Sequence, residues 1–500
     1  MFLRHRAARL AGYVVVAAVS FLFVVGHRWS QMGTNPSGID QGHWLAFGRA
    51  YWGEGNSSLS DLFPISIMPP LIPTLMAAGT SLFGPETASR VLAVGSILAV
   101  MTATFLLTRR VAHQLVATAA AVLVGLSATI VEPAAWGGYP QNVALAAMII
   151  AVYCASGYLS RPSGQSLLIY SLALFVVASS HHAYFGITSA SVVVVCGLWS
   201  LARPGWGASK NRVAALVLAS VPSLALFAFV AWSLVRAHYD PAIDASGSSL
   251  AGALRFAFPT VRWLWVVIGA VGFLGFTSHG FWRFNAVEWR SSLALVMVAL
   301  LAFPLTGEAR VLPPLVIGCT VSAGWVIRSL ASQVSPYRAT SAALAVALAT
   351  VAVAWPSTDR KAQIAFDYYK VLDPSMVHAA QYLDSVPGSG KAAVRTDLRG
   401  WPVGWWFRGL TGRPVLVGSD ARWLGFPKER TQAEAVNELF AVTASAEAVR
   451  QSALDQGIAM LVFRPRDWAG WRDWSFGDGE PLSVVYDDGE YMILAVRGAP

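Results

Sequence analysis

The sequence predicts a polytopic α-helical membrane protein that carries one soluble α/β domain after its last span. Two observations lead to this fold class. Hydrophobic residues make up 55% of the 500 residues and charged residues only 13%, whereas a soluble domain carries roughly 25% charge. Eleven apolar stretches fall within residues 11–355, and the apolar pattern then stops. We therefore expect a transmembrane domain over 1–356 and an α/β domain over 357–500.

The apolar stretches approach the length that a helix needs to cross a bilayer, about 20 residues. We expect spans at 10–26, 86–108, 111–131, 141–159, 166–180, 183–202, 213–235, 263–278, 291–306, 311–328 and 339–355. The apolar stretch 67–83 has prolines at 69, 70 and 73, which favour a re-entrant or interfacial segment. The basic start and first apolar run resemble a signal peptide, but no clear cleavage site follows, so we expect an uncleaved first helix.

Basic residues are distributed unequally between alternate loops. The richer set holds Arg4, Arg6, Arg9, Arg109, Arg110, Arg161, Arg203, Lys210, Arg212, Arg283, Arg290, Arg328 and Arg338. In the other set, the loops at 132–140 and 181–182 contain no Lys or Arg. Because basic loops stay in the cytoplasm, we expect a cytoplasmic N-terminus and an extracytoplasmic C-terminal domain. This placement also explains the net charge of +9 without a nucleic-acid partner.

The first extracytoplasmic loop, residues 27–85, contains an amphipathic segment that begins at Asp40. Apolar and aromatic residues recur at 44, 45, 47, 51 and 52, as in a helix that lies in the membrane interface. Two interpretations of Asp40 stay open: a helix N-cap, and a general base that faces a lipid-borne substrate. His43 in the same segment is a candidate substrate-binding residue.

This loop resembles that of a known superfamily. An Asp-initiated interfacial helix, then Pro69-Pro70-Leu71, then a run closed by Leu82-Phe83-Gly84, is similar to the first outer loop of GT-C glycosyltransferases. The distant similarity extends to protein mannosyltransferases that use dolichyl-phosphate-mannose and to oligosaccharyltransferases. The resemblance implies a multi-span enzyme that takes a sugar from a polyprenyl-phosphate carrier, with Asp40 as the catalytic Asp.

Further polar residues lie in the short outer turns, where charge near membrane depth is costly. Glu132 is a candidate second carboxylate at the site, or a helix-end carboxylate that faces water. His181 and His182 are candidates for phosphate or metal contact, or a polar cap on the turn. Asp40, Glu132 and His181 could together hold a divalent metal such as Mg²⁺ or Mn²⁺, although no cofactor is certain.

The turn 306–310 interrupts two apolar helices and contains Glu308 and Arg310. Arg310 is the candidate to hold the carrier phosphate, because guanidinium offers planar, bidentate donors. The alternative is a local surface pair between Glu308 and Arg310.

The C-terminal segment reads as a compact α/β unit. Strands are expected at 391–396, 414–417, 458–463, 483–486 and 491–496, and helices from Asp373-Pro374 and near 402–411, 429–441 and 443–455. Residues 401–409 resemble the WWDYG region of oligosaccharyltransferases, which makes Trp405, Trp406 and Arg408 candidate substrate-binding residues. Phe407 replaces the Asp of that motif, so asparagine glycosylation of peptides is not predicted. The tryptophans of this domain fit carbohydrate binding or, as the alternative, docking onto the headgroup layer.

Together these features predict an inverting glycosyltransferase of the GT-C type in a bacterial plasma membrane. It would transfer a sugar from a polyprenyl-phosphate-linked donor to a cell-envelope glycan or glycolipid on the outer face, with Asp40 as general base. The alternative is a non-catalytic transporter or envelope-assembly protein on a similar scaffold. The sequence contains no Walker A, zinc-protease or nucleophile-elbow motif.

Overall fold

The computed structural model describes residues 2–33, 38–53, 68–202, 206–239, 262–278, 286–306, 311–331, 336–388, 390–441, 445–477 and 479–499. Contacts divide the chain into two compact units. Unit 1 comprises Met1–Met32, Leu92–Phe229 and Gly247–Phe366, and unit 2 comprises Gly33–Val91, Val230–Ser246 and Asp367–Pro500. The first outer loop therefore belongs to the same unit as the C-terminal domain.

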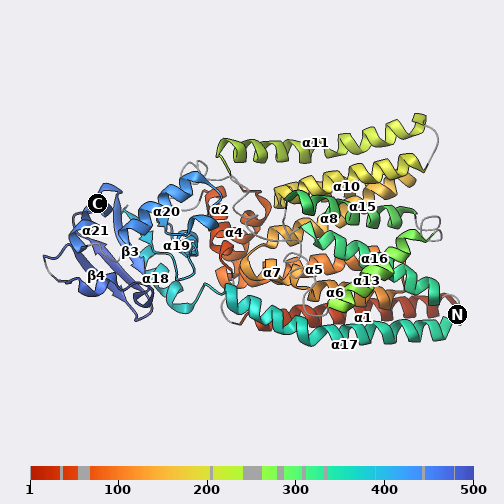
Figure 1. Ribbon diagram of the computed structural model, residues 1–500, viewed down its shortest axis with the longest axis horizontal. Helices are drawn as coiled ribbons and strands as arrows, with labels where there is room; N and C mark the ends of the chain where they lie inside the picture. Colours follow the sequence, from red (N-terminus) through yellow and green to blue (C-terminus); the bar gives the residue numbers. More distant parts are fainter. Residues whose placement is uncertain are drawn as a thin grey trace. The chain divides into compact units, whose positions relative to one another are not determined.

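Unit 1 is built from long helices (Figure 1). They are α1 (Phe2–Gln31), α5 (Pro85–Thr108, which begins in unit 2), α6 (Gln114–Leu126), α7 (Ala128–Trp136), α8 (Tyr139–Ser160), α9 (Gly164–Ser180), α10 (His182–Leu201), α11 (Trp206–Arg236, which ends in unit 2), α13 (Arg262–Thr277), α15 (Ala286–Thr306), α16 (Pro313–Ala331) and α17 (Pro336–Tyr369, which ends in unit 2). Every predicted span lies on one of these helices or, for 111–131, mainly on the α6–α7 pair.

The apolar helices identify a multi-pass membrane protein. In the described part of the chain, seven helices are long and apolar enough to cross a membrane, or eight if α6 and α7, bent by 46°, form one span. α4 (Leu71–Phe83), α9 and residues 267–277 are shorter apolar helices. The helix count is near the eleven spans expected from the sequence.

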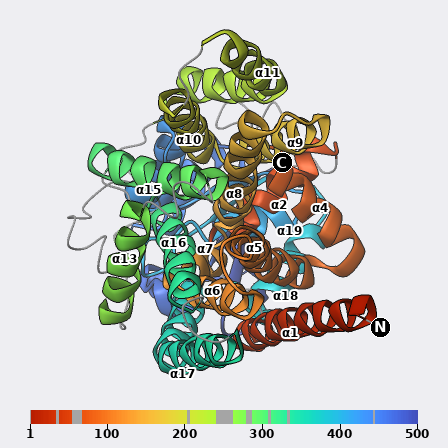
Figure 2. The ribbon, with the colours of Figure 1, turned by 90° about the vertical axis from the view of Figure 1, so that its right-hand side faces the viewer.

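α1 and α17 run parallel within unit 1. The rings of Phe23 and Trp355 lie 5.4 Å apart, and His27 Nε2 lies 2.5 Å from Asp359 Oδ1. A later residue of α1 thus contacts a later residue of α17, so the two helices run in the same direction. They lie side by side in Figures 1 and 2. α17 therefore runs toward the end of unit 1 opposite the start of α1, and it continues without a break past residue 356, where the sequence placed the domain boundary.

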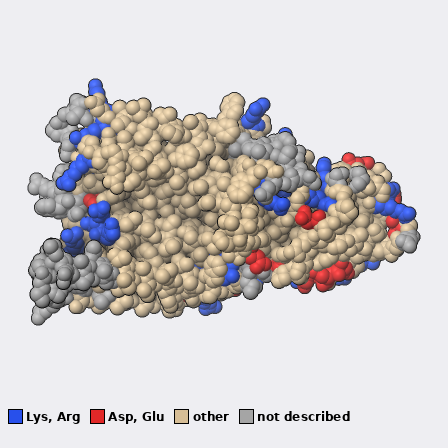
Figure 3. All heavy atoms as spheres, turned by 180° about the vertical axis from the view of Figure 1, so that it is seen from behind, with Lys and Arg blue, Asp and Glu red and all other residues tan. Residues whose placement is uncertain are grey.

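Lys and Arg side chains gather at one end of unit 1 (Figure 3). Tyr13 contacts His113 and Phe21 contacts Phe105, with ring centroids 5.1 and 5.9 Å apart, so α1 and α5 are antiparallel. The Arg109–Arg110 turn after α5 thus lies beside residues 13–21 of α1. The broad face of unit 1 in Figure 3 is almost free of charged residues, and Lys and Arg cluster at one end of it. A belt almost free of charge with a basic end matches a bilayer-spanning bundle.

Unit 2 contains two helices of the first outer loop and the C-terminal α/β domain. Its elements are α2 (Asp40–Tyr51), α4, α18 (Pro374–Ser385), β1 (Lys391–Val394), α19 (Gly404–Leu410), β2 (Val415–Val417), a 3-10 turn (Ala421–Trp423), α20 (Pro427–Leu439), α21 (Ala446–Asp455), β3 (Ile458–Phe463), 3-10 turns at Pro465–Asp467 and Gly470–Asp473, β4 (Leu482–Asp487) and β5 (Met492–Val496). The expected strands and helices of this domain are confirmed, with ends shifted by a few residues.

The five strands form one mixed sheet in the order β2-β1-β3-β5-β4. β2, β1 and β3 are parallel, and β5 pairs antiparallel with both β3 and β4. All six residues of β3 are buried, as expected for an apolar strand at the centre of a covered sheet. The Asp373 carboxylate accepts a hydrogen bond of 2.7 Å from Met376 N, which confirms the helix start expected at Asp373-Pro374.

Candidate active site

Asp40 is the first residue of helix α2, within unit 2. Ile39, with helical φ and ψ, holds the N-cap position and makes no side-chain cap. The structure therefore does not place Asp40 as the N-cap. Asp40 is half-buried in the first turn, where the helix dipole stabilises a negative charge. An ionised carboxylate is what a general base requires.

Gly38 fixes the backbone immediately before Asp40. Its φ of 122° lies in a region that favours glycine. Its N–H donates to Tyr369 O at 3.0 Å, and its carbonyl accepts from Trp406 Nε1 at 2.9 Å. The start of α2 is thus held by the end of α17 and by α19 of the C-terminal domain.

Helix α19 packs directly against α2. A Cβ on Gly42 would lie 2.5 Å from Trp406 N, and a Cβ on Gly409 would lie 2.6 Å from Gly42 O. Arg49 Nη1 donates to Gly409 O at 3.1 Å. Glycine on both helices therefore permits a backbone approach that a larger residue would prevent, and this approach positions the helix that Asp40 begins.

His43 lies inside this helix pair and not in solvent. Its ring is 4.4 Å from that of Trp405 and 4.7 Å from that of Phe47. Burial, with a smaller contribution from the charge of Arg408, lowers the pKa of His43 to about 3. His43 is therefore neutral at physiological pH. Its buried Nδ1 has no hydrogen-bond partner in the described part of the chain.

The other candidates on α19 are buried as well. Trp405 is 8% exposed and Trp406 is 0% exposed. The Arg408 guanidinium donates through Nε and Nη2 to Val415 O, at 3.2 and 2.8 Å. Burial raises the pKa of Glu429 to about 7, against the nearby charge of Arg408. These three side chains support the fold around α2, and direct substrate contact by them stays a prediction.

Glu132 lies on α7 of unit 1, half-buried, one residue before a proline inside the helix. α7 ends at Gly137, whose φ of 104° is left-handed, and Gly138 N donates to Pro133 O at 2.6 Å. The left-handed glycine thus lets the chain turn tightly between α7 and α8. A role of Glu132 at the site stays a prediction.

His181 and His182 lie at the turn between α9 and α10 in unit 1. His181 is the N-cap of α10, and its Nδ1 accepts from Tyr184 N at 3.5 Å. The two imidazole rings stack, with centroids 5.4 Å apart. The structure therefore shows His181 as a polar cap of this turn. The cap uses Nδ1 and does not need Nε2.

Glu308 and Arg310 lie outside the described residues. Among the residues that are described, no three His, Cys, Asp or Glu side chains gather as a metal site would require. A divalent metal held by Asp40, Glu132 and His181 stays a prediction.

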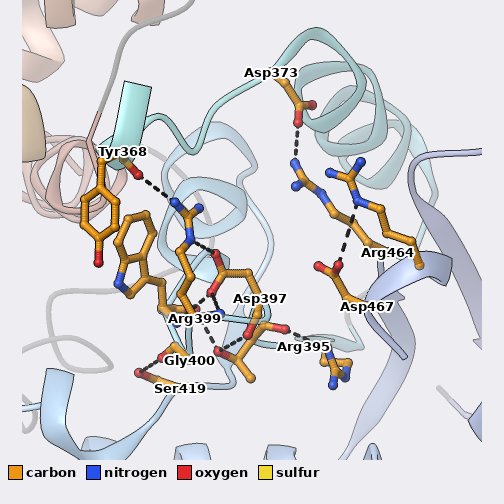
Figure 4. Close-up of polar contacts among 12 residues, drawn as sticks. Tyr368, Asp373, Arg395, Asp397, Arg399, Gly400, Ser419, Arg464 and Asp467 are labelled. Carbon is orange, nitrogen blue, oxygen red and sulfur yellow. Dashed lines mark hydrogen bonds and ion pairs between the residues drawn. The ribbon is translucent and has the colours of Figure 1, made fainter. Parts of the chain in front are cut away.

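The sequence analysis missed a cluster of charged residues after strands β1 and β3 (Figure 4). The Asp397 carboxylate accepts from Arg399 N, Arg399 Nε and Trp401 N at 2.8–2.9 Å. The Arg399 guanidinium lies 3.4 Å from the Trp401 ring centroid, and Arg464 pairs with Asp373. The signal in the sequence was the alternation of Arg and Asp directly after two apolar strands.

Comparison with solved structures relates this chain to two membrane proteins. ArnT from Cupriavidus metallidurans, solved with bound undecaprenyl phosphate, is 14% identical with a TM-score of 0.54, over 99% of each chain. ArnT in the apo state gives 15% and 0.53, over 98% of each chain. The archaeal oligosaccharyltransferase AglB from Archaeoglobus fulgidus gives 13% and 0.52, over 91% of this chain and 70% of that one.

The chain has the GT-C fold. The similarity extends over nearly the whole chain, so the GT-C fold includes both the membrane helices and the C-terminal domain. It confirms, at the level of fold, the resemblance carried by the first outer loop. No protein-family model matches the chain, and no curated protein matches it.

Proposed function

We propose that this protein is a membrane glycosyltransferase that transfers a sugar from a polyprenyl-phosphate carrier to a cell-envelope glycan or glycolipid. The observation that carries the proposal is the GT-C fold, shared over nearly the full length with ArnT, which was solved with undecaprenyl phosphate. AglB, an oligosaccharyltransferase with the same fold, was solved with a dolichol-phosphate. A shared fold is an analogy and not a demonstration of activity, so the site residues must be tested.

Asp40 is proposed as the general base. The acceptor hydroxyl gives its proton to the carboxylate while its oxygen forms a bond with the anomeric carbon of the donor. The bond from that carbon to the phosphate oxygen breaks, and the lipid phosphate leaves with the bonding electrons. The phosphate is already a good leaving group, so one carboxylate suffices, and a single displacement inverts the anomeric configuration.

The position of Asp40 supports this role. The carboxylate begins an interfacial helix, its backbone is fixed through Gly38, and the helix dipole favours its ionised form. Arg310 stays the proposed contact for the carrier phosphate, because its guanidinium could neutralise the charge of the leaving group. Dependence on Mg²⁺ or Mn²⁺ is a separate prediction, checked by assaying transfer before and after chelation with EDTA.

The proposed location is a bacterial plasma membrane, with the C-terminal domain and the first outer loop on the extracytoplasmic side. Two observations support this location. α1 and α17 run parallel, which supports a position of the C-terminal domain on the side of the membrane opposite the start of α1. The basic residues at the ends of the helices support a cytoplasmic position for the start of α1.

The test measures transfer of radiolabelled sugar from polyprenyl-phosphate donors to membrane acceptors. Asp40→Asn should lose about 10²–10⁴-fold in rate, as expected for a lost general base. Asp455→Asn, on helix α21, is the matched control and should transfer as the wild type does. Equal transfer by Asp40→Asn and wild type would remove Asp40 from the mechanism. If the wild type transferred none of the donors, a transporter or envelope-assembly role would be favoured.

A further inference from the structure

Three arginines lie together where helices α5 and α16 end in unit 1. Arg109 and Arg110 form the turn directly after α5, and Arg328 lies in the last turn of α16. Arg328 Nη1 donates to Val111 O at 3.4 Å. Its guanidinium therefore reaches the backbone immediately after Arg110, and the three residues are called the arginine cluster below.

Close packing of α16 against the turn after α5 supports this arrangement. A Cβ on Gly324 would lie 3.2 Å from Thr108 Cγ2 and 3.3 Å from Ala112 Cβ, so Gly324 contacts residues on both sides of the turn. Arg328 follows Gly324 by four residues, which places both on the same face of α16. The packing that fixes Gly324 thus also directs Arg328 toward this turn.

The charges of the arginine cluster are exposed and not neutralised by the protein. All three residues are exposed, and none of them forms an ion pair with another residue that the structure describes. Arg109 lies 5.8 Å from the centre of the Phe105 ring, and Arg328 has only its bond to a backbone carbonyl. The nearby Glu288 is hydrogen-bonded to Tyr153. Neighbouring positive charges repel one another, and an anion between them removes this repulsion.

The position of the cluster favours a lipid headgroup over a soluble anion. α5 and α16 both contain candidate membrane spans, at Pro85–Thr108 and Pro313–Leu330, so the arginines lie at the ends of spans. Apolar side chains beside them are open to the surroundings, because Leu106 is 39% exposed and Leu330 is 61% exposed. Acyl chains can cover these leucines while a phosphate contacts the guanidinium groups, which bind phosphate through paired hydrogen bonds.

We propose that Arg109, Arg110 and Arg328 bind the phosphate of an anionic phospholipid whose acyl chains lie along the apolar ends of α5 and α16. Basic clusters between membrane helices bind anionic headgroups in this way. A zwitterionic lipid fits less well, because its cationic group would face three arginines. The inference goes beyond the proposed function, since it requires neither sugar transfer nor the residues around Asp40. In the proposed orientation, the bound lipid belongs to the cytoplasmic leaflet.

The experiment measures the lipids that the full-length protein retains, by native mass spectrometry, after reconstitution in nanodiscs with equal amounts of phosphatidylglycerol and phosphatidylcholine. The wild type should retain phosphatidylglycerol preferentially. Arg109→Gln, Arg110→Gln and Arg328→Gln should each weaken this preference about 5-fold, as for the loss of one basic residue at an anionic membrane surface. The triple variant should lose the preference altogether.

Lys210→Gln is the matched control. Lys210 is exposed on α11, so this variant loses one positive charge of unit 1 and keeps the arginine cluster. It should retain phosphatidylglycerol as the wild type does. A second measurement compares melting temperatures in nanodiscs of pure phosphatidylcholine and in the mixture. The wild type should melt higher in the mixture, and the triple variant, which should be folded in both, should show no such gain.

Four results would overturn the inference. The first is equal retention of the two lipids by the wild type. The second is a loss in Lys210→Gln as large as in the single arginine variants, which would show that total charge attracts the lipid. The third is displacement of phosphatidylglycerol by inorganic phosphate at comparable affinity, and the fourth is stronger retention of a polyprenyl phosphate. Loss of transfer in Asp40→Asn with unchanged lipid retention would keep this inference separate from the proposed function and support both.

Discussion

At the residue scale, burial decides what the polar side chains around α2 can do. His43 follows Asp40 by three residues, yet its ring is enclosed by Trp405 and Phe47 and its pKa is lowered to about 3. A neutral imidazole at this position cannot supply a positive charge to a phosphate. Asp40, half-buried at the helix start, keeps access to solvent. Within one short segment, His43 is thus enclosed by aromatic rings while Asp40 is only half-buried.

The buried His43 makes stability depend on pH. The folded-state pKa of about 3 lies below the ordinary value of 6.5, so between these values the unfolded chain binds a proton that the folded chain does not. Stability therefore falls as pH falls through this window, by at most about 1.4 kcal/mol per pH unit. His43→Phe removes this term and should show a flatter apparent melting temperature between pH 7 and pH 4.5. Thermal-shift measurements on the purified protein check this.

The exposed His378 on α18 supplies the control. His378→Gln should keep the slope of the wild type. A slope in His43→Phe as steep as that of the wild type would show that His43 is accessible to protons in the folded protein.

At the element scale, the contact between α2 and α19 links the first outer loop to the C-terminal domain within unit 2. The contact depends on small residues, because Gly42 and Gly409 let the two backbones approach. The same contact buries Trp406, which donates to Gly38 O across 368 residues of sequence. The helix that Asp40 begins is therefore positioned by an element that follows all the spans.

Gly42→Ala should disturb this contact. Its Cβ would lie 2.5 Å from Trp406 N, and overpacking of this kind costs about 1–3 kcal/mol. We expect a lower apparent melting temperature and, if Asp40 is the base, slower sugar transfer. Gly197→Ala, where a Cβ meets nothing within 4 Å, is the matched control. If both variants melt like the wild type, α2 and α19 are not tightly packed in solution.

Asp373 has two roles at the start of α18, as the N-cap and as the ion-pair partner of Arg464. Asp373→Ala removes both, and loss of the cap alone costs about 1 kcal/mol. Asp373→Asn can still cap the helix, so it should lose less. The ordered decrease in apparent melting temperature, wild type above Asn above Ala, checks both roles. Equal effects of Asn and Ala would mean that the ion pair alone matters.

At the scale of the whole molecule, the direction of the helices determines which parts share a side of the membrane. α17 runs parallel to α1 within unit 1. We therefore predict that the chain leaves α17 on the side of the membrane opposite the start of α1. This prediction does not depend on the number of spans between the two helices. In Figure 3, Lys and Arg cluster at one end of a broad face of unit 1 that is almost free of charged residues.

The orientation can be checked by cysteine labelling in intact cells. In a variant that lacks Cys154, Cys196 and Cys319, a cysteine introduced at exposed Asp455 should react with an impermeant maleimide from outside. One introduced at Arg109 should react only after the cells are permeabilised. Labelling of both sites from outside would contradict the predicted topology, and the reverse pattern would invert it.

The sequence by itself determined the membrane helices, the strands of the C-terminal domain and the GT-C resemblance, because periodicity, composition and helix caps depend on neighbouring residues. The cap at Asp373 and the turn at His181 are local features of this kind. Only the tertiary structure decided that His43, Trp406 and Arg408 are buried, that α1 and α17 are parallel, and that the charged residues after β1 and β3 lie together. Each of these depends on contacts between segments far apart in the chain, which no local pattern encodes.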